Sequence, residues 1–294
     1  MNSDLKVKII GENPSSLILA LALAKTNCEI YLDKSSKYSD AYSKDDIIIY
    51  SKNACQFFDK IYIWNKLKNS SNRFKSQSFY DCINSKEILF QSRDLDKDKI
   101  VSNNYGFFSN YLNFKRIFID ELNKHENIQF IPESNNSSNI RNFDLVFKFT
   151  KISQNKNKIY NLISRSKTNH TQKILSFNVY LRGNIEGRFY EINTKEGFIM
   201  FIPISKHIYQ IKWCDNIYKT NERLILSKSL LLDNLTSILP IDFKIDQIIG
   251  DVYIDKNYIF TFPFYSSNSL IYFDKYIYKS CLINNLLLNI TIND

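Results

Sequence analysis

The first apolar positions of the chain alternate and then cluster in the order strand, helix, strand. Leu5–Ile10 alternates as a short buried strand, and Gly11 interrupts it. Residues 15–25 have the Leu and Ala content of a buried helix, and residues 28–32 form a second apolar strand. This order predicts a right-handed crossover unit, the start of a parallel sheet covered by helices.

Two further stretches continue the alternation of strand and helix. Residues 46–67 predict a strand followed by one helix that buries Phe57, Ile61 and Trp64 on a single face. Residues 74–90 instead alternate in short segments, as expected of antiparallel strands inserted after the first parallel elements.

Helical spacing returns in residues 110–127, and two short apolar strands follow at Ile128–Ile131 and at residues 142–149. These elements complete the predicted parallel sheet. The predicted buried face of the helix is formed by Leu112, Ile117, Ile119 and Leu122.

Strand patterns dominate the second half of the chain. Residues 173–214 are a succession of apolar, β-branched and aromatic segments, which predicts a mainly antiparallel sheet. Residues 220–239 predict one helix capped by Thr220 or Asn221. Residues 258–272 predict a last strand region.

Together these patterns predict an α/β fold with α+β insertions, in which a Rossmann-like parallel sheet is interleaved with a mainly antiparallel sheet. The parallel-sheet domain takes residues 1–73 and 100–160, and the antiparallel-sheet domain takes residues 74–99 and 161–280. Residues 281–294 form a divergent end.

The composition fits a folded protein without a membrane span or a signal peptide. The 294 residues, 44% of them hydrophobic, can bury a large core. The longest apolar run, residues 17–24, is far shorter than the roughly 20 residues that cross a bilayer. The net charge of +9 is spread along the chain without a recognition motif, so nucleic acid is not an expected partner.

Cysteine and histidine are few and scattered. The five cysteines lie far apart without a C-x-x-C pair, which favours a reducing cytoplasm over a disulfide framework or a zinc site. The three histidines stand among polar residues, and we expect each to be a surface side chain. No metal site is predicted.

The turn after the first strand has the spacing of a dinucleotide-binding turn but lacks two of its glycines. Such a turn needs a sharp bend, a backbone that a pyrophosphate can approach, amide N–H groups at the helix N-terminus and an acidic residue for the ribose. Gly11, Asn13 and Ser16 occupy the three glycine positions. Asp33 follows Gly11 by 22 residues, close to the expected interval of about 20.

The substitutions at this turn leave two interpretations open. Asn is the non-glycine residue that best tolerates positive φ, and Ser is small enough for helix and strand to approach. Both add atoms where phosphates would pass, so Asn13 and Ser16 are expected to lower nucleotide affinity. In the alternative interpretation, the turn only connects the strand to the helix.

Five segments carry a resemblance to a known family. In chain order they are VKIIGENPSSLILALALAKTNCEIYLD, YSKNACQFFDKIYIWNKL, NYLNFKRIFIDELNKHENIQF, FDLVFKF and FYEINTKEGFIMFIPISKHIYQIKW. They are similar to the FAD-binding start, the Ser-rich segment, the helix and strand after the first insertion, the strand before an Asp-Gly pair, and the substrate-sheet segment of flavin-dependent aromatic monooxygenases. Over residues 5–283 the chain resembles the para-hydroxybenzoate hydroxylase type, and most closely the ubiquinone-biosynthesis hydroxylase family.

That resemblance implies an FAD enzyme whose flavin is reduced by NAD(P)H and, after reaction with O2, transfers oxygen to a phenolic ring. The implied substrate is a prenylated phenol. The implied location is the cytoplasm or the inner membrane surface, in a complex with other ubiquinone-pathway proteins. No catalytic base is predicted. The residues implied in cofactor binding are Gly11, Asn13, Pro14, Ser15, Ser16 and Asp33, with Arg116 as a phosphate or flavin neighbour.

Three departures from the family pattern fall at cofactor contacts. Asp46 stands near the position of an Arg, and Thr150 and Lys151 stand where the Asp-Gly pair would follow. Residues 281–294 lack the Gly-Asp-Ala motif that opens the helix facing the flavin. We therefore expect a C-terminally shortened relative with degenerate cofactor motifs. The alternative function is a non-catalytic subunit or scaffold with weak or lost FAD binding, and a third is a module for a membrane surface or nucleic acid.

Overall fold

The structure is a computed structural model of the chain, and it divides into two units that are described separately. The first unit comprises residues 1–71, 108–168 and 258–294, and the second comprises residues 72–107 and 169–257. The described residues are 5–11, 13–33, 47–50, 52–91, 104–131, 142–149, 172–182, 187–195, 197–239, 244–254, 264–267, 270–273 and 287–288.

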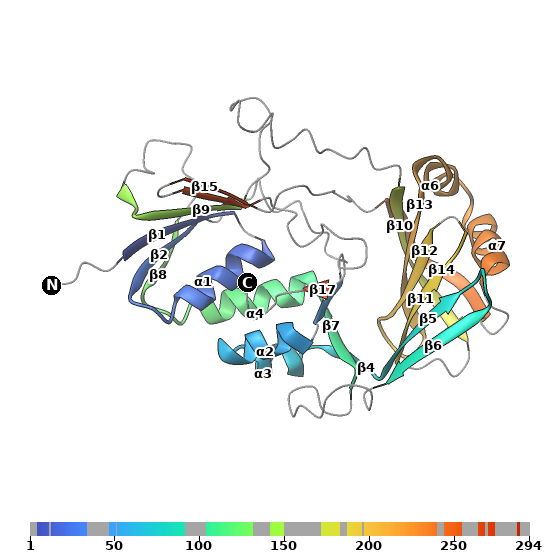
Figure 1. The fold of residues 1–294 in the computed structure, drawn as a ribbon, viewed down its shortest axis with the longest axis horizontal. Helices are drawn as coiled ribbons and strands as arrows, with labels where there is room; N and C mark the ends of the chain where they lie inside the picture. The colour runs from blue at the N-terminus through green and yellow to red at the C-terminus, as the bar shows by residue number, and fades with distance from the viewer. Residues whose placement is uncertain are drawn as a thin grey trace. The chain divides into compact units, whose positions relative to one another are not determined.

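A six-stranded sheet lies in the first unit (Figure 1). Its strand order is β15-β16-β9-β1-β2-β8, and neighbouring strands run parallel except for the β15/β16 pair. The predicted α/β class with a parallel sheet is confirmed. The strands are β1 (Leu5–Ile10), β2 (Cys28–Asp33), β8 (Ile128–Ile131), β9 (Leu145–Phe149), β15 (Phe264–Ser267) and β16 (Leu270–Phe273).

Helix α1 (Pro14–Leu23) makes the predicted crossover from β1 to β2, which are parallel neighbours. It packs against both strands and against helix α4 (Tyr111–Leu122). Leu17 and Leu21 on α1 are fully buried, together with Ile9 and Ile30 of the two strands. Full burial of each such side chain contributes about 1.5–3 kcal/mol, so this contact holds α1 on the sheet.

The segment after β3 (Ile47–Tyr50) forms two helices, α2 (Lys52–Lys60) and α3 (Trp64–Asn69), and the prediction of one helix is wrong. Tyr62 adopts a φ of 60°, a left-handed conformation that ends a helix. Ile61 and Trp64 are buried as predicted, but Phe57 is only half-buried. Phe58 is completely buried in its place.

The predicted buried face of α4 is confirmed only at Leu122, and it is wrong at the other three positions. Leu112 is 47% exposed, and Ile117 and Ile119 are only half-buried. An aromatic stripe at helical spacing forms the core instead, and the ring centroids of Phe114 and Phe118 lie 4.5 Å apart. Aromatic rings bury more area than aliphatic side chains and gain from edge and tilted contacts, which favours this rotation of the helix. The buried residues of α4 are Tyr111, Phe114, Phe118 and Leu122.

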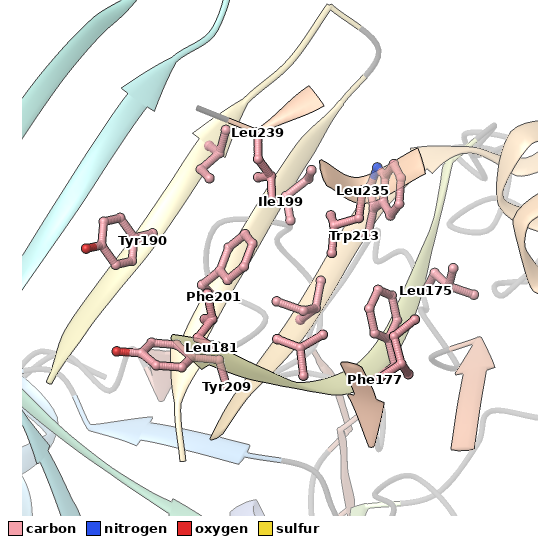
Figure 2. Packing of buried hydrophobic residues seen from close by; sticks show 14 of the residues in the cluster. Leu175, Phe177, Leu181, Tyr190, Ile199, Phe201, Tyr209, Trp213, Leu235 and Leu239 are labelled. Carbon is pink, nitrogen blue, oxygen red and sulfur yellow. The ribbon is translucent and has the colours of Figure 1, made fainter. Parts of the chain in front are cut away.

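A mainly antiparallel, seven-stranded sheet lies in the second unit, as predicted. Its order is β14-β10-β13-β12-β11-β5-β6, and β11/β5 is a parallel pair. Alternate residues such as Phe177, Phe201 and Trp213 form an apolar face that packs with Leu235 of helix α7 (Lys228–Ile238) (Figure 2). The strands are β5 (Ser76–Asp81), β6 (Lys86–Gln91), β10 (Gln172–Arg182), β11 (Arg188–Asn193), β12 (Phe198–Pro203), β13 (Ile208–Asn216) and β14 (Lys244–Ile254).

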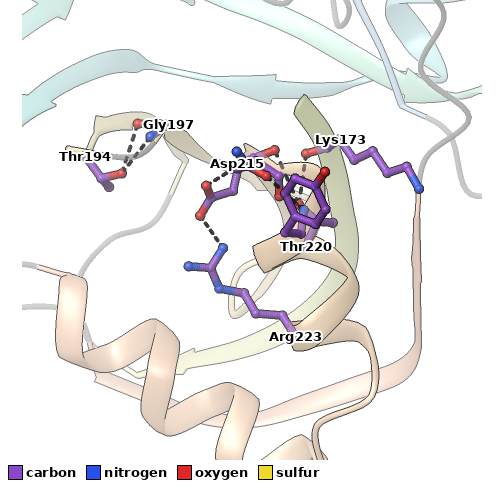
Figure 3. A network of polar contacts seen from close by, with 8 residues as sticks. Lys173, Thr194, Gly197, Asp215, Thr220 and Arg223 are labelled. Atoms are coloured by element: carbon purple, nitrogen blue, oxygen red, sulfur yellow. Dashed lines mark hydrogen bonds and ion pairs between the residues drawn. The ribbon is translucent and has the colours of Figure 1, made fainter. Parts of the chain in front are cut away.

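Two helices, α6 (Ile217–Leu224) and α7, replace the single helix predicted for residues 220–239. The caps are Asn216 and Ser227, whose side chains accept hydrogen bonds from the Tyr218 and Leu230 amides. Each cap satisfies a helical N–H that has no carbonyl partner, so two helix starts are stabilised. Thr220, predicted as a cap, lies buried within α6 and its hydroxyl donates to the Asn216 carbonyl at 2.9 Å (Figure 3).

Near the end of the chain, the boundary between the two units differs from the domain boundary that the sequence predicts. Residues 161–280 were expected in the antiparallel domain, but residues 258–294 belong to the first unit, where β16 pairs in parallel with β9. A short apolar strand does not specify its partner, so periodicity alone could not assign it. A further sheet has the order β17-β3-β7-β4, with β4 (Asn72–Phe74), β7 (Gly106–Asn110) and β17 (Leu287–Leu288).

Among the described helices, none combines the length and the apolar character needed to cross a bilayer.

Candidate functional site

The turn between β1 and α1 lies at the carboxyl edge of the parallel sheet, beside the end of β9. Gly11 has a φ of +111°, and a Cβ atom placed on it would stand 2.4 Å from the carbonyl oxygen of Phe149. Only glycine combines this conformation with this approach. The first position of the predicted nucleotide-binding turn therefore has the backbone geometry expected of it.

The second position differs from the expectation in its geometry. Asn13 has a φ of −137°, an extended conformation open to any residue, so positive φ is not the reason for glycine here. Its side chain caps α1: Oδ1 accepts from the Ser16 amide at 3.0 Å. The Asn13 amide in turn donates to Ser16 Oγ at 2.9 Å. This reciprocal arrangement is a capping box, with Ser16 in the position of the reciprocal acceptor.

Ser15 carries two further donors of the turn, its amide and its hydroxyl. Pro14 is the first helical residue and has no N–H, and the Asn13 and Ser16 amides are engaged in the capping box. The amide of the second helical residue, Ser15, has no intrahelical acceptor. Within the described part of the chain, Ser15 Oγ is buried without a hydrogen-bond partner, in a residue that is only 4% exposed.

Asp33 lies at the same edge of the sheet as the turn. It ends β2 directly beside Ile10, the last residue of β1, and is 3% exposed. Lys148 of β9 flanks Ile10 on the other side, and desolvation by burial lowers the pKa of its amine. The carboxylate and the amine thus stand on the two strands that border β1, at the edge where ligands of open α/β sheets bind.

Arg116 does not join this group in the described residues. Its side chain is 81% exposed on α4, and its Nε lies 3.8 Å from Asp120 Oδ2 one helical turn further on. The structure thus brings together Gly11, Asn13, Pro14, Ser15 and Ser16 in one turn and places Asp33 at the same edge. The predicted departures at Asp46, Thr150 and Lys151 lie outside the described residues, and so does the departure at residues 281–294 except for residues 287–288.

The second face of the seven-stranded sheet is polar, and it was not predicted from the sequence. Ser176, Gln210 and Lys212 alternate with the apolar residues of β10 and β13, a pattern typical of a solvated sheet face. All three are nevertheless at most 3% exposed. The alternation was visible in the sequence, but the burial of its polar members was not.

Glu191 of β11 lies on this polar face. Pairing across the sheet places it opposite Met200, Met200 opposite Lys212, and Lys212 opposite Ser176. Burial raises the pKa of Glu191 to about 7. The hydrogen bond that Gln77 Nε2 donates to its carboxylate at 3.1 Å acts in the opposite direction and lowers the pKa. A carboxyl that titrates near neutral pH on a buried polar surface is a candidate for proton exchange.

The residues of the β1–α1 turn fit a nucleotide phosphate in part. Gly11 allows close approach, and the amide and hydroxyl of Ser15 are hydrogen-bond donors at the positive end of the α1 dipole. The capping box opposes the fit, since it occupies two further amides of the turn. No group of three or more metal-ligating side chains converges within the described residues.

The chain is similar to known proteins in its fold. No family model and no curated protein matches the sequence. PqsL from Pseudomonas aeruginosa, a probable FAD-dependent monooxygenase, is similar with a TM-score of 0.67 and 10% identity, over 92% of this chain and 78% of that chain.

Two further solved structures show the same likeness. The p-nitrophenol 4-monooxygenase PnpA from Pseudomonas putida has a TM-score of 0.57 and 11% identity, over 92% of this chain and 72% of its own. The flavin-dependent halogenase CmlS has a TM-score of 0.64 and 14% identity, over 97% of this chain and 56% of its own. The chain has the mixed α/β fold of these proteins, with a parallel sheet and a separate, mostly antiparallel sheet.

Proposed function

We propose that this protein binds FAD at the β1–α1 turn and is an oxidoreductase of the monooxygenase type. The observation that carries the proposal is the Ser15 hydroxyl, buried at the N-terminus of α1 without a partner among the described residues. A buried hydroxyl normally finds a partner, and a phosphate oxygen would supply one. The fold likeness to PqsL, described as a probable FAD-dependent monooxygenase, and to the p-nitrophenol 4-monooxygenase PnpA supports the same assignment.

Each residue of the site has a role in this proposal. Gly11 lets the backbone approach the pyrophosphate, and the Ser15 amide and hydroxyl donate to it. The Asp33 carboxylate accepts hydrogen bonds from the ribose hydroxyls. FAD, when bound, would supply hydride acceptance and oxygen transfer. Arg116 has no role in this site.

We extend the proposal to a prenylated phenol as substrate and NAD(P)H as reductant, on the basis of the sequence resemblance. The polar face of the seven-stranded sheet supports a substrate with a hydroxylated ring, because the Glu191 carboxyl lies on that face. Contact with a membrane surface and with other ubiquinone-pathway proteins belongs to the same extension.

The cofactor proposal is tested by titrating the full purified chain with FAD and following flavin fluorescence. We expect saturable binding. Ser15→Ala should weaken it roughly tenfold to hundredfold, because a hydrogen bond to a charged group contributes about 1.5–3 kcal/mol. Ser229→Ala, at the same second position of α7, is the matched control and should leave the affinity unchanged. A folded chain that neither binds FAD nor is stabilised by it would contradict the proposal.

A second candidate function is a non-catalytic subunit or scaffold, and the capping box favours it. Asn13 and Ser16 satisfy by themselves two of the amides that a dinucleotide would use, so the turn is stable as a simple connection. This candidate predicts a colourless, folded protein that co-purifies with an active hydroxylase.

A further inference from the structure

Asn13 occupies the place in the turn where a nucleotide phosphate would receive hydrogen bonds. Its Oδ1 lies 3.0 Å from the Ser16 amide nitrogen, and the residue is 1% exposed. Its Nδ2 lies 3.4 Å from the Phe149 carbonyl oxygen. The side chain therefore bridges α1 and β9, with its oxygen directed to the helix and its amide group directed to the strand.

We propose that the Asn13 side chain is an internal competitor for the phosphate, which holds the Ser16 amide until a nucleotide displaces it. This inference rests on the proposed function. An amide oxygen carries only a partial negative charge, whereas a phosphate oxygen carries a formal charge and makes shorter, stronger hydrogen bonds with N–H donors. The helix dipole adds to the preference for the anion. A phosphate displaces Asn13, but with the loss of the capping interaction.

The size of this penalty follows from the energetics of helix caps. Replacing an Asn cap by Ala removes an interaction whose loss corresponds to roughly a twofold to thirtyfold change in an equilibrium constant. Replacing it by Gly changes helix stability far less, because Gly is itself tolerated at the N-cap. Removing the Asn13 side chain should therefore strengthen nucleotide binding without unfolding the helix.

The buried Ser15 hydroxyl distinguishes this turn from one in which Asn13 is only a helix cap. A turn that only started a helix would need no donor beyond the capping box, yet the Ser15 hydroxyl is buried beside it with no partner in the described part of the chain. Side chains in the first helical turn lean toward the N-terminus, so this hydroxyl is directed to the end of α1 that Asn13 closes. The Ser15 hydroxyl is thus in place to bind an anion, whereas the neighbouring Ser16 amide is held by Asn13.

The test compares the wild-type chain with Asn13→Gly and with a matched Asn216→Gly control, which removes the cap of α6 in the second unit. FAD binding is followed by flavin fluorescence, and binding of ADP, the half of the ligand that contains the pyrophosphate, is followed by thermal stabilisation. Asn13→Gly should bind both ligands more tightly than the wild type, and the control should match the wild type. Asn13→Ala is the second variant, and it should bind both ligands roughly twofold to thirtyfold more tightly.

Two outcomes would overturn the inference in distinguishable ways. If the wild type binds FAD and the Asn13 variants bind it equally or more weakly, the competitor role is wrong and the proposed function stands. If none of the folded chains binds FAD or ADP, the proposed function fails and the inference fails with it.

Discussion

The carbonyl oxygen of Phe149 lies 2.4 Å from the point that a Cβ atom on Gly11 would occupy, and Gly11 has a φ of +111°. Any side chain at this position would be strained by its own backbone and would collide with β9. We expect Gly11→Ala to lower the free energy of unfolding by about 2–5 kcal/mol, as the sum of conformational strain and overpacking. Urea denaturation of the purified chain measures the loss.

Gly250 provides the control for the conformational part of this effect. Its φ is +70°, but no heavy atom lies within 4 Å of its Cβ position. Gly250→Ala should therefore cost only about 1–2 kcal/mol, the penalty for a left-handed residue. Equal losses in the two variants would contradict the steric role of Phe149.

The aromatic face of α4 gives a second prediction. Phe118 is completely buried, and its ring centroid lies 5.9 Å from that of Phe58 and 4.5 Å from that of Phe114. Phe118→Ala should lower the free energy of unfolding by about 3–5 kcal/mol through the cavity it leaves. Leu112→Ala, on the exposed side of the same helix, should change it by less than about 0.5 kcal/mol. A larger effect at Leu112 would support the face that the sequence pattern predicted.

The structure of the first unit could be predicted where the apolar pattern was compatible with only one arrangement of elements. The β1–α1–β2 crossover follows from alternation, a leucine-rich helix and a glycine between them. On α4 two stripes were available, and periodicity favoured the aliphatic stripe through Leu112 over the aromatic stripe through Phe118. The choice depends on what the helix packs against, which the sequence of α4 does not contain.

The candidate site was predictable as a spacing but not as a set of contacts. The positions of Gly11, Asn13 and Ser16 could be predicted from the spacing of the motif. The capping box could not, because it depends on the extended φ of Asn13. The buried polar face with Glu191 could not be predicted, because alternating polar residues on a strand usually face water. Their burial is a property of the tertiary structure alone.

The Arg223–Asp215 ion pair in the second unit supports a third prediction. Asp215 is 1% exposed, and the Arg223 guanidinium pairs with it (Figure 3). The same guanidinium lies 3.9 Å from the ring centroid of Trp213. Arg223→Ala leaves a buried carboxylate without its cation, and should lower the free energy of unfolding by about 3–5 kcal/mol. Denaturant titration measures this loss.

An exposed ion pair of the same residue types is the matched control. Arg182 pairs with Asp246, and the Arg182 side chain is 72% exposed. Arg182→Ala should lower the free energy of unfolding by less than about 1 kcal/mol, because solvent screens the pair. If both Arg→Ala variants lose the same stability, burial of Asp215 is not the source of the effect.

Glu191 gives the stability of the chain a defined pH dependence. Burial raises its pKa from the ordinary 4.5 to about 7 in the folded chain. Between these two values the folded state holds the proton more tightly than the unfolded state does, so the free energy of unfolding should fall as pH rises. The stabilising contribution is complete below about 4.5 and is lost as pH passes through about 7.

Glu191→Gln isolates this contribution, because a glutamine keeps the shape of the protonated carboxyl and cannot lose a proton. The free energy of unfolding of the wild type minus that of the variant should fall steadily between pH 4.5 and 7 and level off above this range. At pH 8 the variant should be the more stable protein, since it buries no charge. Glu222→Gln, an exposed carboxylate on α6, controls for the loss of one negative charge. A difference that stayed constant across the range would mean that Glu191 ionises in the folded chain as readily as it does in the unfolded chain.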